Sequence, residues 1–349
     1  MGSKLFLTGS TGYIGGTLID TLVKEHPEYD ITVLLRKVPD GFKERYPKVK
    51  IIKGDYDSAE IISDAASKAN IVVHCGNSDH EPVMKALLSG LLSQSTPTFL
   101  IHLGGTGIIA DWQSPSPGYG QLNPKVWSDI DDLPTITSLP DEALHRNVDK
   151  LILSAAAAHK GKLHTAIVCP PDIYGPGRGT ARTQSFYVPS LLSESRKVGA
   201  TFYAADGSNT RSWVHMEDLM SVFTRLVEEA VKGGGRADWG VDGGYYFAAT
   251  QEHSQRTIAE HAGRILHAHG LLPSPTPVQL PIEQIGAMMA QIGPQVGLYQ
   301  FASNSRSRAD RAPKVLGYKP SHPGFLDVLE SDLLSAVRAP QPVRGLEKA

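Results

Sequence analysis

Three evenly spaced glycines near the start of the chain could hold a diphosphate. Residues 8–16 read TGSTGYIGG, between an apolar run at 4–8 and a helical pattern. Glycine permits a turn with positive φ and lets the backbone approach a ligand closely. A helix that begins there would point free N–H groups and its positive dipole end at that ligand. The pattern is a variant of the dinucleotide-binding fingerprint G-x-G-x-x-G, in the strand-to-helix context that the fingerprint requires. The predicted phosphate cradle comprises Gly9, Thr11, Gly12, Tyr13, Ile14 and Gly15.

Two cations after the second apolar run indicate which dinucleotide is preferred. An NAD-preferring site would place an acidic residue after Leu35 to bind the ribose 2′-hydroxyl. This chain has Arg36 and Lys37 instead, which suit a 2′-phosphate, although they could also form a solvated basic turn. Asp55, after the third run, is a candidate for binding the adenine amino group. We therefore predict NADP(H) as the preferred cofactor, with NAD(H) as the alternative.

The elements that must position these residues follow an alternating pattern. Strands that are nearly all apolar and alternate with helices indicate a parallel sheet covered on both faces. The expected fold class is α/β, a doubly wound parallel sheet of the Rossmann type with a smaller, partly helical C-terminal substrate lobe. The predicted strands cover residues 4–8, 31–35, 49–52, 71–75, 98–103 and 164–169, and the predicted helices cover 58–68, 80–93 and 142–159.

The alternation weakens after residue 175, which suggests where the dinucleotide-binding domain ends. We assign residues 1–175 to that domain, with 213–249 as a segment that could return to it. The substrate lobe is assigned to 176–212 and 250–340. A stretch rich in Pro, Ser and Asp at 111–140 is too long for an ordinary connection, and insertions of this length are often functional.

Composition excludes several other classes of protein. The 34 lysines and arginines balance 36 aspartates and glutamates, a formal charge of −2 that argues against a nucleic-acid-binding surface. Only two cysteines, Cys75 and Cys169, are present, so we do not expect a disulfide scaffold. We expect a reducing compartment instead. The sequence shows no secretory signal pattern and no run of 18 apolar residues. We therefore expect a cytoplasmic protein without a membrane partner or a metal site.

Five segments in the same order resemble the extended short-chain dehydrogenase/reductase family. They are the TGSTGYIGG at 8–16, GDYDS at 54–58, CPPDIYGPG at 169–177, RSWVHMEDL at 211–219 and LGYKP at 316–320. This family includes nucleotide-sugar epimerases and dehydratases and dihydroflavonol-type reductases. The resemblance implies a doubly wound fold, a nicotinamide dinucleotide cofactor and a small-molecule substrate. Because members are often dimers, a homodimer is the expected assembly.

The resemblance breaks at the catalytic motif. The family uses a Ser or Thr after the fifth strand and a Tyr-x-x-x-Lys on the next helix, but no Tyr-x-x-x-Lys occurs between residues 104 and 165. In the register that we prefer, Asp141 falls on the Tyr position and His145 on the Lys position. A second register places Arg146 and Lys150 there, and neither register restores the tyrosine.

Three residues remain as catalytic candidates in this atypical site, namely Thr106, Asp141 and His145. Thr106 follows glycines that stand where the family has hydroxyls, and it could bond a substrate oxygen or cap a turn. The ordinary pKa of histidine lies nearest neutrality, so His145 could act as acid or base, or could be a solvated helix residue. Asp149, four residues later on the same predicted helix face, could raise the pKa of His145 or form a surface pair with it.

Further binding residues follow from the resemblance. The segment with Pro170, Ile173 and Tyr174 matches a family segment that lines the nicotinamide carboxamide, where the absent proline N–H groups shape the backbone contacts. Arg211 matches a family arginine that often binds substrate phosphate, and its fork suits an anion. Tyr119, in the long insertion, could supply the missing tyrosine from elsewhere or could simply be exposed. Arg211 and Tyr119 are therefore the substrate-binding candidates.

Two hypotheses of function follow. The first is an NADP(H)-dependent oxidoreductase with an atypical active site, which reduces a carbonyl or performs epimerase/dehydratase-like chemistry on a small molecule. The second is a non-catalytic NADP(H)-binding sensor, which the lost tyrosine favours. The retained nicotinamide-side segment at 170–177 favours the enzyme.

Overall fold

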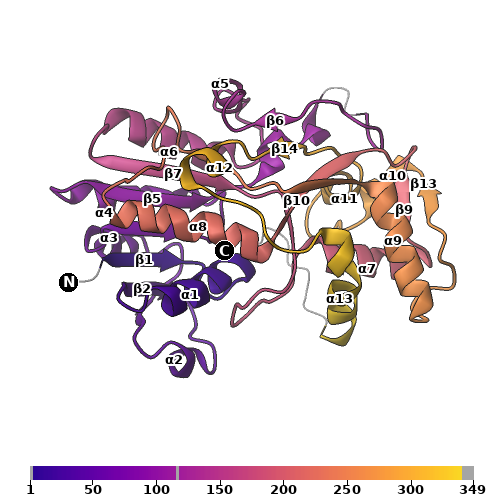
Figure 1. Cartoon of the computed structure of the whole chain (residues 1–349), viewed down its shortest axis with the longest axis horizontal. Helices are drawn as coiled ribbons and strands as arrows, with labels where there is room; N and C mark the ends of the chain where they lie inside the picture. Colours follow the sequence, from indigo (N-terminus) through magenta and orange to yellow (C-terminus); the bar gives the residue numbers. More distant parts are fainter. Residues whose placement is uncertain (1–2, 115–117, 340–349) are drawn as a thin grey trace.

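A computed structural model describes residues 3–114 and 118–339 of the chain (Figure 1). Its largest feature is a seven-stranded sheet in which every neighbouring pair of strands is parallel. The strand order is β11-β7-β5-β4-β1-β2-β3. The order reverses beside β1, and ligands of such sheets bind in the crevice at that point, beyond the carboxyl ends of the strands. The strands are β1 (Lys4–Thr8), β2 (Asp30–Leu35), β3 (Lys50–Lys53), β4 (Ile71–His74), β5 (Thr98–Leu103), β7 (Leu163–Cys169) and β11 (Tyr245–Phe247).

Helices cover both faces of this sheet, as its apolar strands require. Along β1, Leu5 and Leu7 face one hydrophobic cluster and Phe6 faces the other, because successive side chains of a strand point to opposite faces. The first cluster lies under α1 (Tyr13–Glu25), α8 (Met216–Val231) and α12 (Arg311–Leu316), and the second lies under α3 (Ala59–Ser67), α4 (Glu81–Ser93) and α6 (Arg146–Ala158). A short helix, α2 (Phe42–Arg45), precedes β3. The predicted doubly wound fold is confirmed.

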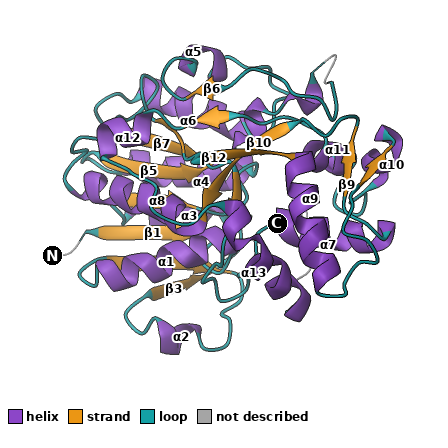
Figure 2. Ribbon diagram, turned by 45° about the vertical axis from the view of Figure 1, so that its right-hand side comes forward, coloured by secondary structure: helices purple, strands orange, loops and turns teal. Residues whose placement is uncertain are grey.

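A second lobe lies beside the carboxyl ends of the large sheet (Figures 1 and 2). Its core is aromatic: Trp213 stacks on Phe325 with ring centroids 3.9 Å apart, and Tyr187 meets Trp213 edge to face. The lobe contains the three-stranded sheet β12-β10-β8 and the pair β13-β9. Its elements are β8 (Asp172–Tyr174), α7 (Tyr187–Val198), β9 (Phe202–Ala204), β10 (Thr210–His215), β12 (Gln251–Ser254), α9 (Gln255–Ala268), β13 (Val278–Leu280), α10 (Ile282–Ala287), α11 (Val296–Phe301) and α13 (Phe325–Arg338).

The long insertion runs along the top of both lobes in Figure 1 and contains little regular structure. The 3₁₀ turn η1 (Thr106–Ile109) precedes the insertion, which holds the 3₁₀ turn η2 (Asp111–Gln113), β6 (Trp127–Ser128) and α5 (Leu133–Ile136). β6 pairs with β14 (Ser307–Arg308), which ties the insertion to the C-terminal part of the chain.

The predicted elements of the large sheet agree with the structure to within one or two residues, apart from one helix. The helix predicted over 142–159 begins only at Arg146. The segment 213–249 contributes the end of β10 to the small sheet, and its last strand, β11, pairs with β7 in the large sheet. Within the described ranges, no helix is long and apolar enough to span a lipid bilayer.

Candidate functional site

The turn between β1 and α1 has the geometry of a phosphate cradle. Gly9 has a φ of +76°, and a Cβ on it would overlap the carbonyl oxygen of Cys75. A Cβ on Gly15 would in turn overlap the carbonyl oxygen of Gly9. Gly12 is the N-cap of α1 and provides no side-chain cap, while the first N–H groups of a helix have no acceptors within it. The turn therefore requires glycine, and α1 offers donors to an anion.

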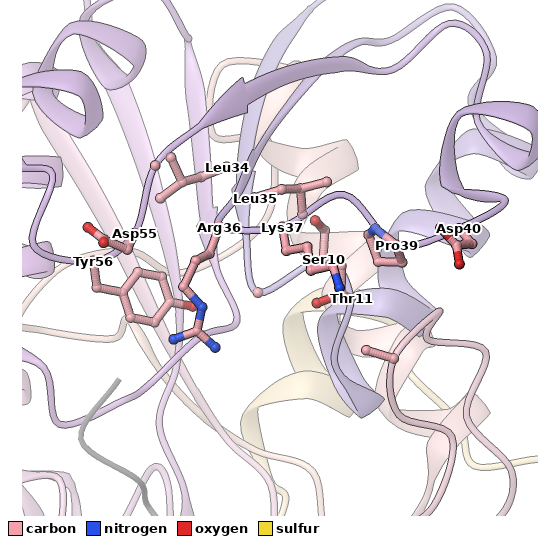
Figure 3. A pocket seen from close by; sticks show the side chains of 13 residues that line it. Ser10, Thr11, Leu34, Leu35, Arg36, Lys37, Pro39, Asp40, Asp55 and Tyr56 are labelled. Atoms are coloured by element: carbon pink, nitrogen blue, oxygen red, sulfur yellow. The ribbon is translucent and has the colours of Figure 1, made fainter.

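A cavity of about 500 Å³ lies beside this turn and receives the residues predicted to bind adenosine (Figure 3). Thr11 lines it from the turn, Arg36 and Lys37 from the end of β2, and Asp55 from the end of β3. Both cations are exposed. Tyr56 lies on the same side of the cavity as Arg36. The predicted set is thus brought together beyond the carboxyl ends of β1, β2 and β3, next to the point where the strand order reverses.

The carboxylate of Asp55 is fixed by its own turn. Its Oδ1 accepts hydrogen bonds from Ser58 Oγ at 2.7 Å and from the backbone N–H of Asp57 at 3.2 Å. The hydrogen bond from Ser58 holds the pKa of Asp55 below its ordinary value. Asp55 is therefore an anionic acceptor at neutral pH, which suits an exocyclic amino group.

A loop from the second lobe packs onto the glycine turn. The backbone N–H groups of Ala181 and Arg182 donate to the carbonyl oxygen of Thr11 at 2.9 and 3.3 Å. A Cβ on Gly179 would overlap the carbonyl oxygen of Gly12. Arg178 is held to α1 by an ion pair with Asp20 at 2.6 Å. The second lobe is therefore attached at the cradle itself, which its Gly- and Arg-rich sequence did not reveal.

A second cavity, of about 520 Å³, opens over the carboxyl ends of β4 and β5 and beside the start of β8. It begins at the N-terminus of α1, where the hydroxyl of Tyr13 donates to the carbonyl oxygen of Gly175 at 2.6 Å. It shares no lining residue with the first cavity, but the two meet at the glycine turn, which lines both. Five predicted site residues line it, namely Gly12, Tyr13, Ile14, His145 and Ile173.

The imidazole of His145 is oriented by a carboxylate in this cavity. Its Nδ1 lies 2.8 Å from Asp79 Oδ1 and 3.1 Å from Ser78 Oγ, and its side chain is only 10% exposed. The carboxylate accepts the Nδ1 proton, which leaves Nε2 to act on a ligand. A Cβ placed on Gly105 would lie 2.9 Å from Nε2, so Nε2 faces the glycines that stand where the resembled family has hydroxyls. This arrangement is that of a positioned general acid or base.

His145 also has a strained backbone. It is the N-cap of α6, with a φ of 70°, in the left-handed region that non-glycine residues rarely occupy. The conformation turns its ring away from the α6 surface and toward Asp79. Strain of this kind, about 1–3 kcal/mol, is concentrated at functional sites.

Two other catalytic candidates are placed elsewhere. Thr106 is buried, and its hydroxyl lies 3.1 Å from that of Ser305, whose Oγ also donates to the Thr106 carbonyl oxygen. Asp141 is on the surface, with its side chain 69% exposed, and pairs with Lys150 at 2.6 Å. Neither residue lines the cavity with His145. Thr106 therefore holds η1 in place. The exposed, ion-paired position of Asp141 is contrary to its predicted role as a catalytic residue.

The alternative register fails for the same reason. Lys150 is engaged by Asp141, and Arg146 is buried, where it donates to the carbonyl oxygens of Leu139 and Thr137. Neither Arg146 nor Lys150 reaches the cavity. Both side chains secure the segment that precedes α6.

Arg211 does not face the cavity as an anion-binding residue. Its side chain is 5% exposed, and its Nε pairs with Asp172 at 2.5 Å. It also donates to the carbonyl oxygen of Tyr299 at 2.9 Å, with its guanidinium 4.7 Å from the centre of that ring. Its charge is balanced below the cavity wall, which corrects the expectation that it binds substrate phosphate.

The remaining predicted residues lie behind the cavity wall. Tyr174 is buried in the second lobe, where its hydroxyl donates to the carbonyl oxygen of Pro323. The carbonyl oxygen of Pro170 accepts a hydrogen bond from the backbone N–H of Thr106. Pro171, rather than Pro170, lines the cavity together with Ile173. Tyr119 donates its hydroxyl to the carbonyl oxygen of Trp112 at 2.7 Å and so supports a cavity residue without lining the cavity itself.

Asp149 is not the partner of His145. It is 1% exposed, accepts a hydrogen bond from the hydroxyl of Tyr245 at 2.9 Å, and has its Oδ1 without a partner among the described residues. Burial raises the pKa of Asp149 to about 6. The folded protein therefore keeps this carboxyl protonated at pH values where the unfolded chain has lost the proton.

We expect the stability of Asp149→Asn relative to wild type to increase as pH rises. A raised pKa stabilises the fold fully below the ordinary value near 3.8, and this stabilisation is lost as pH rises through about 6. The free energy of unfolding of the variant relative to wild type should increase by about 2.5 kcal/mol between pH 4 and pH 8, at 1.4 kcal/mol per pKa unit. Urea unfolding at both pH values measures it.

Asp141→Asn is the matched control. Lys150 lowers the pKa of Asp141, so the stability of Asp141→Asn relative to wild type should change little with pH, and in the opposite direction. If the stability of Asp149→Asn relative to wild type does not change with pH, Asp149 is ionised in the folded protein.

The chain is similar in sequence and in fold to known proteins. The sequence profile of the NAD dependent epimerase/dehydratase family matches residues 5–86 and 142–241, more than half of the chain. The chain belongs to this family. The match confirms the resemblance to extended short-chain dehydrogenases/reductases, of which epimerase/dehydratase-type enzymes are members. A relative from Acremonium sp, named Oxidase ucsJ, is 30% identical over 341 residues, which cover 95% of this chain and 96% of the relative.

Other members of the epimerase/dehydratase family are more distant. A dTDP-glucose 4,6-dehydratase of Mycobacterium tuberculosis is 25% identical over 244 residues, covering 64% of this chain and 69% of that protein. Among solved structures, dTDP-glucose 4,6-dehydratase from Bacillus anthracis in complex with NAD has a TM-score of 0.64, with 13% identity and 97% of each chain covered. UDP-glucose 4-epimerase from Thermotoga maritima has a TM-score of 0.62, with 15% identity, covering 96% of this chain and 99% of its own. At these identities, the structures establish the shared fold.

This member of the epimerase/dehydratase family contains site residues that sequence reasoning missed. Asp79 lies in the turn after the carboxyl end of β4. Because ligands bind at that edge of a parallel sheet, its position could have been recognised from the sequence. Tyr299 and Trp112 meet edge to face with ring centroids 5.6 Å apart, and both line the cavity. Tyr299 is 154 positions from His145 in the sequence, so no spacing could have linked the two.

Proposed function

We propose that the protein is an NADP(H)-dependent oxidoreductase that reduces the carbonyl group of a small molecule or oxidises the corresponding alcohol. The observation that carries this proposal is the convergence of two proton-bearing side chains. A Cβ built on Gly107 would lie 3.0 Å from Tyr299 Oη and 3.3 Å from His145 Nε2. Both side chains line the cavity. A substrate oxygen between them would have two donors.

Each of the two side chains has a separate role. Burial raises the pKa of Tyr299, so its hydroxyl stays protonated and donates a hydrogen bond to the reacting oxygen. Protonated His145 gives its Nε2 proton to that oxygen as the carbonyl becomes an alcohol, and Asp79 remains a carboxylate that stabilises the imidazolium. The ring is then reprotonated from solvent. In the direction of oxidation, neutral His145 accepts the alcohol proton.

The cofactor assignment rests on the fit of the residues to a dinucleotide. The donors at the start of α1 would hold the diphosphate, and Arg36 with Lys37 would hold a 2′-phosphate. Ile14, Pro171 and Ile173 would contact the nicotinamide end. When bound, the nicotinamide donates or accepts the hydride.

Titration and turnover test this proposal together. We expect NADPH to bind at micromolar concentration and its absorbance at the reduced-nicotinamide band to fall when aldehydes and ketones are added. Absence of NADPH binding would refute the proposal. Tight binding without oxidation by any member of a broad carbonyl panel would favour the non-catalytic NADP(H) sensor instead.

Tyr299→Phe should lower kcat by about 10-fold to 100-fold, because one hydrogen bond to a developing charge contributes about 1.5–3 kcal/mol. The phenylalanine ring keeps the contacts with Trp112 and Arg211, so the melting temperature and the Kd of NADPH should be unchanged. Steady-state kinetics at saturating NADPH measures the effect.

Tyr119→Phe is the matched control, since its hydroxyl donates to the backbone of Trp112 and Tyr119 itself does not line the cavity. Loss of kcat in Tyr119→Phe but not in Tyr299→Phe would show that the long insertion, and not α11, supplies the tyrosine.

A further inference from the structure

The wall of the second cavity beyond the nicotinamide end is apolar and aromatic. It is formed by the insertion, by the segments before α6 and α7, and by α11 with the residues before it. Trp112 and Tyr299 form one side, and the other residues are Leu144, Phe186, Ile292 and Val296. Apolar and aromatic walls with a few placed polar groups are typical of sites for small, largely apolar ligands.

The charges near this wall are already balanced within the protein. Asp172, which lines the cavity, pairs with buried Arg211 at 2.5 Å and accepts a hydrogen bond from Gln300 Nε2 at 3.2 Å. Arg211 is the residue that the family resemblance assigns to a substrate phosphate. Bound to Asp172 and to Tyr299, it presents no net charge to a ligand.

Arg182 is the one arginine or lysine among the described residues that line this cavity. Its backbone N–H is bonded to Thr11, and its guanidinium donates to the carbonyl oxygens of Gln184 and Ser185. Its backbone is therefore tied to the glycine turn, and its guanidinium is held by two carbonyl oxygens of the segment that leads to α7. A diphosphate at the opposite end would be desolvated against aromatic side chains, which is unfavourable for a charged group.

We infer that the substrate is a neutral, largely apolar, ring-bearing ketone or alcohol rather than a nucleotide diphosphate sugar. The inference rests on the proposed function, because it assigns the substrate class of the same cavity. The ring system lies against Trp112 and the aliphatic residues, which leaves the oxygen at His145 and Tyr299. Association is driven by burial of apolar surface.

Calorimetric titration of the full chain with and without NADPH tests this inference. The probes are the bicyclic ketones 1-tetralone and 2-decalone, with UDP-glucose and dTDP-glucose as the charged alternatives. We expect both ketones to bind the NADPH complex with Kd values at least tenfold lower than those of both nucleotide sugars. Equal or tighter binding of either nucleotide sugar, or no binding of either ketone, would overturn the inference.

Trp112→Ala locates the binding in this cavity. It should raise the Kd of both ketones at least tenfold while the Kd of NADPH changes by less than twofold. Trp127→Ala is the control, because Trp127 is half-buried on β6 outside the cavity. Unchanged ketone binding in Trp112→Ala would overturn the inference. Failure of NADPH to bind refutes the proposed function by itself, and the titration of the cofactor-free protein still ranks ketones against nucleotide sugars.

Discussion

Replacing His145 with alanine should lower kcat/KM for carbonyl reduction by about 10² to 10⁴-fold, the usual contribution of a positioned general acid or base. The effect follows from geometry, because Asp79 holds Nδ1 and directs Nε2 at the space over Gly105. The Kd of NADPH should change little, since the cradle and both cations are untouched. Stopped-flow reduction with a saturating ketone and a parallel NADPH titration measure the two quantities.

His145→Asn separates proton transfer from structure. Asparagine tolerates the left-handed backbone at this position better than most residues and can still bond Asp79, but it cannot carry a proton. It should lose as much activity as alanine while keeping the melting temperature of wild type. Full activity in either variant would exclude His145 as the proton carrier, and activity retained by Asn alone would assign it a positioning role.

Reversing the charge at position 36 should change the cofactor preference. Arg36→Glu is expected to weaken NADPH binding by about 10-fold to 100-fold, because a charge-assisted contact with phosphate contributes about 1.5–3 kcal/mol. Binding of NADH should improve, since the carboxylate can accept from the ribose 2′-hydroxyl. The ratio of the two Kd values, measured by nucleotide fluorescence, reports the change.

Lys43→Glu controls for the general effect of a negative charge near the site. Lys43 lies on α2, is exposed, and does not line the adenosine cavity. It should alter both Kd values by less than threefold at 150 mM salt, where exposed charges are screened within about 8 Å. A similar preference in Arg36→Glu and wild type would mean that Arg36 does not contact the 2′-phosphate.

The fold could be predicted because its signals are local. Six of the seven strands of the large sheet contain an apolar run, and Gly15 packs on Gly9 within one turn of the chain, although Gly9 itself packs on Cys75. The cradle, both cations and Asp55 could also be placed, because the carboxyl ends of parallel strands meet at one edge.

The catalytic end could not be predicted in the same way. A regular helix over 142–159 would place His145 over Asp149. In the structure α6 begins only after His145, whose left-handed backbone turns the ring toward Asp79. Asp79 and Tyr299 reach the site only through tertiary packing. The family resemblance assigns Arg211 to a substrate phosphate, but its ion pair with Asp172 is a tertiary contact that no local pattern predicts.

The attachment of residues 177–183 to the glycine turn has a consequence for both binding sites. The peptide of Thr11 that borders the diphosphate site also accepts the N–H groups of Ala181 and Arg182. Phe186 and Tyr187, a few residues further on, form part of the substrate wall. One continuous segment thus borders the diphosphate site and carries part of the substrate wall, so a substitution that displaces this segment should weaken binding of both NADPH and the ketone.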